Sequence, residues 1–200
     1  MNEWRGFVTL VCLSSAACSA SVEPPETPAN ALHAEAAKVL AIHAPRYLGT
    51  GTKADALRFI RSDISSWFSV RKAATRTLVA KLEAASSGAA PGSRGIALLH
   101  ADAASLFYSL ARESVDAAAA ATPAEMRADA QVYQAYVGAL VAATLPDLDR
   151  AIAEAQKCIE TAQASELQVA NECRHIAHEA NTLKSRRGVT LPSLDGATRL

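Results

Sequence analysis

Two cysteines that stand fifteen positions apart inside a helix-forming stretch constrain the fold of this chain most strongly. In residues 122–187 the apolar side chains recur at steps of three and four, which is the spacing of one helix face. On a single straight helix, Cys158 and Cys173 would lie about 22 Å apart, whereas a disulfide needs Cα atoms within about 7 Å. A helical hairpin that turns near Ala164–Ser165 would bring them level. We favour the hairpin over one long helix, and two buried free thiols are the alternative to a bridge.

Local signals predict where the helices of this stretch begin and bend. Thr122-Pro123-Ala124-Glu125 has the form of a capping box with proline at the first helical position. Ser165-Glu166-Leu167-Gln168 offers a second capping box beside the expected turn. Pro146 lacks the N–H of a helical hydrogen bond, so we expect a kink or a short break near Thr144–Leu145.

Three further helices are predicted before this stretch, over residues 28–44, about 52–85 and about 95–121. Thr52-Lys53-Ala54-Asp55 is a capping signature for the second of them. That helix carries more large apolar side chains than any other, so we expect it to be central to the core. No segment alternates between apolar and polar residues as a strand would. The sequence therefore predicts an all-α fold without a sheet, either an antiparallel bundle or a short helical-hairpin array of five to six helices.

The charge composition argues against nucleic-acid binding. The 200 residues carry 20 basic and 20 acidic side chains, so the formal charge is zero. Such a chain has no basic field for a phosphate backbone, and we expect no nucleic-acid partner. Half of the residues are hydrophobic but only 5% are aromatic, which is typical of closely packed, alanine-rich helices.

The first 18 residues read as a secretory signal peptide of the lipoprotein type. A short apolar run over residues 7–13 is followed by small residues that lead to Cys18. Ala16-Ala17-Cys18 resembles a bacterial lipoprotein signal, in which the cysteine is lipidated and becomes the new N-terminus, although Ser15 stands where an aliphatic residue is usual. The alternative is ordinary cleavage after Ala17 or Ala20 without a lipid.

The remaining chain divides into a tether, one domain and a tail. Residues 19–28 are rich in Pro, Ser and Glu and read as a disordered tether. Residues 29–187 form a single helical domain, and residues 188–200 a flexible tail. We expect an exported protein, periplasmic or anchored to the outer membrane by lipid alone. In that oxidising compartment Cys158 and Cys173 are an even pair suited to a disulfide.

Candidate chemistry is sparse, and we expect neither catalytic residues nor a cofactor. Glu172 and His175 have the spacing that places a carboxylate and an imidazole on one helix face, with His178 nearby. These three residues are the basis of an alternative function, a helical bundle that binds a small ligand, a metal or haem. A di-iron site would need a second such motif, which the sequence lacks. Arg71 and Lys72 read as solvated charges.

The order of features from residue 93 to 180 resembles a group of tetratricopeptide-like helical envelope proteins of Gram-negative bacteria. The matching elements are Ser93-Arg94-Gly95-Ile96, Pro123-Ala124-Glu125-Met126-Arg127, Pro146-Asp147-Leu148, Cys158 and Asn171-Glu172-Cys173-Arg174. The resemblance implies a non-enzymatic scaffold whose two cysteines are bridged, and it carries over no catalytic residue. Together with the signal peptide, it leads us to expect a lipid-anchored scaffold of the cell envelope that binds an unknown protein partner.

Overall fold

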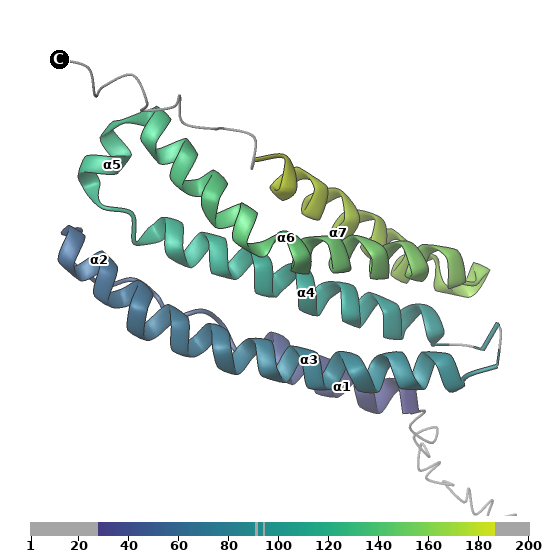
Figure 1. Ribbon diagram of the computed structural model, residues 1–200. Coiled ribbons are helices and arrows are strands. Elements are labelled where there is room, and N and C mark those ends of the chain that lie inside the picture. The colour runs from purple at the N-terminus through teal and green to yellow at the C-terminus, as the bar shows by residue number, and fades with distance from the viewer. Residues whose placement is uncertain (1–27, 91, 94, 187–200) are drawn as a thin grey trace, which may run out of the picture.

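The helices of the described chain lie in three layers, with α4 in the middle (Figure 1). The computed structural model describes residues 28–90, 92–93 and 95–186. One outer layer contains α1 (Pro28–Leu40) and α3 (Ser65–Gly88), the middle is α4 (Ile96–Ala120), and the other outer layer contains α6 (Ala130–Thr161) and α7 (Leu167–Ser185). No strand occurs among the described residues, so the predicted all-α fold is confirmed.

The described residues form six helical segments when α2, the π-helical turn and α3 are counted as one continuous segment. Helix α2 (Lys53–Phe59), a π-helical turn (Ile60–Ile64) and α3 follow one another without a gap, and α5 (Ala124–Ala128) lies between α4 and α6. Within the π turn, the hydroxyl of Ser65 donates to the Ile60 carbonyl at 2.9 Å, five residues back. The predicted cap of this segment is confirmed, because the Thr52 hydroxyl accepts from the backbone N–H of Asp55.

Helix α4 is the centre of the core, so the prediction that the helix at 52–85 would be central is wrong. Twelve residues of α4 are buried, against nine in α2, the π-helical turn and α3 together. Half of the twelve are alanines, and small side chains let neighbouring helices approach α4 from several sides. Ala103 packs in a cluster with α1 and α3, while Ala104 and Ala111 pack against α6 and α7. The central helix is therefore the one whose small side chains let other helices pack closely against it, and not the one with the largest apolar side chains.

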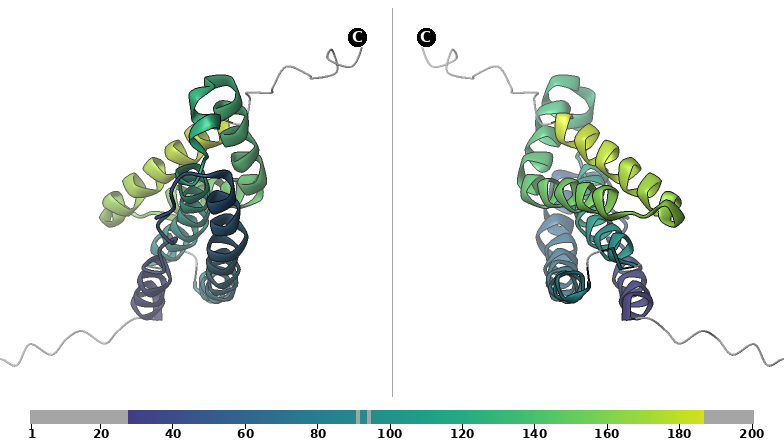
Figure 2. Two further views of the ribbon diagram at one scale, coloured as in Figure 1. Left: turned by 90° about the vertical axis from the view of Figure 1, so that its left-hand side faces the viewer. Right: turned by 90° about the vertical axis from the view of Figure 1, so that its right-hand side faces the viewer.

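Helices α6 and α7 form the predicted hairpin. A 3₁₀ turn at Ala164–Glu166 joins them, and the disulfide between Cys158 and Cys173 links them just beyond the turn, with Cα atoms 6.3 Å apart. The two helices pack against each other, and in the right-hand view of Figure 2 they meet at the turn and open into a V. The single long helix and the two free thiols are thereby excluded.

Pro146 bends α6 without breaking it. The helix continues from Ala130 to Thr161 with Pro146 near its midpoint, and its ribbon changes direction midway (Figure 1). Proline removes one hydrogen bond of the ladder, and the Thr144 hydroxyl bonds the Val141 carbonyl at 3.0 Å in the preceding turn. The kink was predicted correctly, whereas a break does not occur.

Two of the predicted caps are wrong. Thr122 is fully buried and its hydroxyl donates to the Ala119 carbonyl at 2.7 Å, so it completes α4 instead of starting the next helix. The long helix is capped by Asp129, which accepts from the backbone N–H groups of Gln131 and Val132. At the hairpin turn the capping box comes two residues earlier than predicted.

That capping box also joins two loops at one end of the bundle. One oxygen of Glu166 accepts from the backbone N–H of Gln163, and the other accepts from the N–H of Gly95 at the start of α4, both at 3.0 Å. Gly95 has φ +89°, a left-handed conformation that other residues rarely adopt, and a Cβ there would meet the Cβ of Ala29 at 3.0 Å. A side chain at this position would therefore push α1 away from α4.

The predictions for the signal peptide, for Cys18, for all but the last residue of the tether and for the tail lie outside the described residues. The first helix begins at Pro28 as predicted, so this residue does not belong to the tether, and the helix ends at Leu40, before the predicted residue 44. Among the described helices, none is long and apolar enough to span a membrane.

Candidate functional site

A stripe of four polar side chains that are at least partly exposed runs along one face of helix α4. Ser105, Tyr108, Arg112 and Asp116 recur at steps of three and four residues, so they share one side of the helix. This stripe is the floor of a groove. Its walls are α7 along most of its length and, at the end near Ala120, the connector, residues 41–52 between α1 and α2.

We call this surface the α4 groove. It consists of three adjoining depressions along α4, and Asp116 lines two of them. The α4 groove is lined by Ser105, Tyr108, Arg112, Glu113, Asp116, Ala117 and Ala120 of α4, by Gln168, Asn171, Glu172, His175, Ile176, Glu179, Thr182, Leu183 and Arg186 of α7, and by residues 43–47 of the connector.

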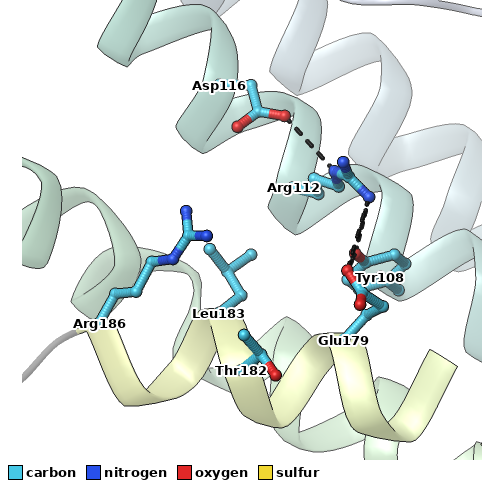
Figure 3. A pocket seen from close by; sticks show the side chains of 7 residues that line it. All are labelled: Tyr108, Arg112, Asp116, Glu179, Thr182, Leu183 and Arg186. Atoms are coloured by element: carbon cyan, nitrogen blue, oxygen red, sulfur yellow. Dashed lines mark hydrogen bonds and ion pairs between the residues drawn. The ribbon is translucent and has the colours of Figure 1, made fainter. Parts of the chain in front are cut away.

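A polar cluster ties α7 to α4 in the middle of the groove (Figure 3). The Tyr108 hydroxyl donates to Glu179 of α7 at 3.4 Å and accepts from Arg112 Nη1 at 3.0 Å. Arg112 also lies 4.0 Å from the Glu179 carboxylate and 3.5 Å from that of Asp116. The cavity at this point measures only about 80 Å³, against about 520 and 570 Å³ at the two ends. The cluster therefore narrows the groove at its centre.

The protonation states in this cluster favour hydrogen bonding over proton transfer. Burial raises the pKa of the Tyr108 hydroxyl, Arg112 opposes that rise and Glu179 adds to it. The hydrogen bond to Tyr108 and the nearby Asp116 raise the pKa of Arg112 further. Tyr108 is thus neutral and Arg112 charged near neutral pH, so both act as donors.

An imidazole–carboxylate pair borders the end of the groove near the start of α4. His33 of α1 bonds through Nδ1 to the carboxylate of Asp102 at 2.8 Å. Burial raises the pKa of Asp102, the bond to His33 lowers it, and the charge of Glu172 across the groove raises it again. A histidine oriented by a carboxylate is one part of a nucleophilic site, but no hydroxyl or thiol of a described residue hydrogen-bonds to His33.

At the other end, the connector is fastened to α4 through Glu113. Its carboxylate accepts from the backbone N–H of Ala44 at 2.9 Å and lies 3.7 Å from His43 Nδ1. The indole N–H of Trp67 on α3 donates to the Ile42 carbonyl at 3.0 Å. These contacts hold the connector across α3 and α4.

The three residues of the alternative metal or haem site do not converge. Glu172 and His175 line the α4 groove, whereas His178 is exposed one turn further along α7 and lines none of the three depressions. Within the described ranges, no three His, Cys, Asp or Glu side chains are placed to hold a metal ion. Glu179 faces α4, where its carboxylate contacts Tyr108 and Arg112.

The prediction that Arg71 is solvated is wrong. Arg71 is completely buried, while Lys72 beside it reaches Asp147 of α6 at 3.7 Å. The sequence contained a signal for this, because Arg71 falls on the same helix face as Trp67, Thr75 and Leu78, which are all buried.

The α4 groove was also missed, since its walls are brought together by the tertiary fold. The polar stripe of α4 was the available signal, but it could as well have marked an ordinary solvent-facing side. No protein-family model, no curated protein sequence and no solved structure matches this chain.

Proposed function

We propose that the protein is a non-enzymatic helical scaffold of the bacterial cell envelope that binds another protein through the α4 groove. The observation that carries the proposal is the groove itself. Side chains of α4, α7 and the connector line three neighbouring depressions along α4, and Glu179 and Glu113 hold α7 and the connector against it. A pre-organised surface lowers the entropy cost of association.

The dimensions of the groove fit a segment of another protein. From Ser105 to Ala120, α4 rises about 22 Å, which is the length of a four-turn helix or a short extended peptide. Small-molecule sites are mostly enclosed, whereas this groove is open along its length. Grooves of this kind accept a helix or a peptide in many complexes.

The side chains at its centre are of the types that contribute most to protein interfaces. Tyrosine and arginine are enriched among residues with large binding energies, and Tyr108 and Arg112 lie adjacent at the narrow point. Arg112 is half exposed, so a partner carboxylate or carbonyl can reach it without displacing Tyr108.

Site-specific photo-crosslinking in the native cell tests this proposal. A photoreactive phenylalanine analogue at Ser105 lies in the groove, and the same residue at Ser69, an exposed serine of α3, is the matched control. We expect a discrete protein adduct from position 105 and none from position 69. Identical adducts from both positions would refute a specific groove partner.

A charge reversal tests whether the groove itself provides the affinity. Arg112→Glu should reduce the adduct from position 105 by about tenfold, as expected for a binding hot spot. Arg76→Glu, an exposed arginine of α3, is the control and should leave the yield unchanged. Equal yields from both variants would remove Arg112 from the interface.

The lipid anchor is a separate part of the proposal and rests on the sequence around Cys18. The intact mass of the protein purified from its native membrane should show a diacyl or triacyl increment on a chain that begins at Cys18. Cys18→Ser should release the protein from the membrane fraction. A mass without that increment would leave a secreted scaffold.

A further inference from the structure

A buried arginine with two unpartnered nitrogen atoms lies between α3 and α4. Arg71 on the inner face of α3 is 0% exposed. Its Nη2 donates to the hydroxyl of Ser109 on α4 at 2.8 Å, while Nε and Nη1 have no hydrogen-bond partner. A buried donor left unpartnered loses its hydrogen bonds to water without replacement. Two such donors on one charged group call for an acceptor.

A second buried side chain, on the next turn of α3, also lacks a hydrogen-bond partner. Thr75 lies one turn after Arg71 on α3, is also 0% exposed, and its Oγ1 has no partner. Residues four apart are neighbours on a helix surface, so the two side chains belong to one site. Buried threonines commonly bond a carbonyl in the preceding turn, and this hydroxyl does not.

The guanidinium also lacks a direct counter-charge among the described residues. Burial lowers the pKa of Arg71, and the charge of Glu113 on α4 opposes that fall. However, Glu113 bonds to Ala44 and lies near His43, and no described carboxylate forms an ion pair with Arg71. Arginine stays protonated in proteins, so the interior holds a positive charge that is only partly balanced.

We propose that Arg71 and Thr75 bind a small oxyanion, with Ser109 as the positioning residue for the guanidinium. An oxyanion such as phosphate or a carboxylate supplies both acceptor atoms and negative charge. It would take the unpartnered donors of Arg71 and Thr75. This site is distinct from the α4 groove and does not depend on the function proposed for it.

Trp67 lies one turn before Arg71 on the same buried face of α3, and its indole N–H donates to the Ile42 carbonyl of the connector. The connector is also bonded to α4 through Ala44 and Glu113. Since Arg71 is closed off from solvent, an oxyanion reaches it only when the packing around it opens. The indole N–H of Trp67 is therefore a reporter, because its hydrogen bond to the connector changes when the connector moves.

The test is an NMR titration of the full chain with inorganic phosphate, acetate and chloride at constant ionic strength. The indole signal of Trp67 is assigned with Trp67→Phe. Phosphate or acetate should move this signal saturably, whereas chloride should not. Arg71→Met should abolish the response, and Arg76→Met, an exposed arginine of α3, should retain it. An equal response to all three ions, or a response that persists in Arg71→Met, overturns the proposal.

Two further variants keep the test decisive if Arg71→Met does not fold. Thr75→Val keeps the shape of the side chain and removes the hydroxyl, and it should weaken binding by about tenfold. Glu113→Gln keeps an acceptor for Ala44 but removes the competing negative charge, so the oxyanion should bind more tightly. Unchanged affinity in Thr75→Val together with weaker binding in Glu113→Gln would refute the assignment.

Discussion

Cys158 of α6 and Cys173 of α7 are joined by a disulfide in a fully buried position, one on each side of the hairpin turn. The bridge closes a loop with a sequence separation of 15 residues. It packs in a cluster with Ala97, Ala101 and Ala155, so it connects the hairpin to the start of α4 as well as closing it.

Loss of the bridge should destabilise the protein. We expect the Cys158→Ala/Cys173→Ala variant to lose about 3 kcal/mol of unfolding free energy, because the unfolded chain gains the freedom that the loop had removed. Urea denaturation of the oxidised, the reduced and the variant proteins measures this. A reductant should have no effect on the variant, and equal midpoints for the oxidised and reduced wild type would contradict the prediction.

Glu154 should stabilise the fold at neutral pH but not in acid. Burial raises the pKa of its carboxyl, but hydrogen bonds from His100 and Lys157, both at 2.7 Å, outweigh burial and hold the pKa below its usual 4.5. Since the folded-state pKa is the lower one, this contribution is present above pH 4.5 and is lost as the pH falls through the folded-state value. Between about pH 6 and pH 3 the wild type should lose stability relative to Glu154→Gln. Parallel stability curves for the two proteins would rule this out.

Asp102 should show the opposite dependence. Burial raises the pKa of its carboxyl above the usual 3.8, in spite of the bond to His33. The folded state therefore holds this proton more tightly than the unfolded state, and the destabilising effect of the charged form is relieved as the pH falls through the folded-state pKa. Thermal unfolding as a function of pH should show the wild type gaining stability relative to Asp102→Asn on acidification. A relative loss would mean that the ionised pair with His33 prevails over burial.

The cap at Thr52 should contribute a measurable part of the stability. Its hydroxyl satisfies the N–H of Asp55 in the first turn of α2. Thr52→Ala should cost about 1 kcal/mol of unfolding free energy, whereas Thr52→Ser should cost little because serine also caps helices. Chemical denaturation compares the three proteins, and equal losses from Ala and Ser would point to the methyl group instead of the hydroxyl.

Local chemistry predicted those parts of the fold that depend on neighbouring residues in the chain. Thr52 caps its helix, Pro146 bends α6, and the hairpin places Cys158 level with Cys173, all as the spacing indicated. The prediction that Thr122 caps the next helix is wrong because of tertiary packing. Its hydroxyl had two possible partners, the next helix or the last turn of α4, and complete burial favours the bond within α4.

The candidate site depended on which helices meet, and the sequence contains little information on that. The stripe at Ser105 and Arg112 becomes a groove only because α7 lies beside it. Arg71 was misread because a charged residue next to Lys72 is most often solvated. Its position around the helix was the better guide, because Arg71 falls on the same buried face of α3 as Thr75 and Leu78.

The middle position of α4 has a consequence for the order in which the chain can mature. Translation delivers α1, α3 and α4 before α6, so for a time the side of α4 at Ala104, Ala111 and Val115 has nothing to pack against. The layer of α1, α3 and α4 has its own apolar cluster, but the opposite side of α4 stays exposed until the hairpin packs onto it. The last helices to be made are therefore the ones that complete the core around α4.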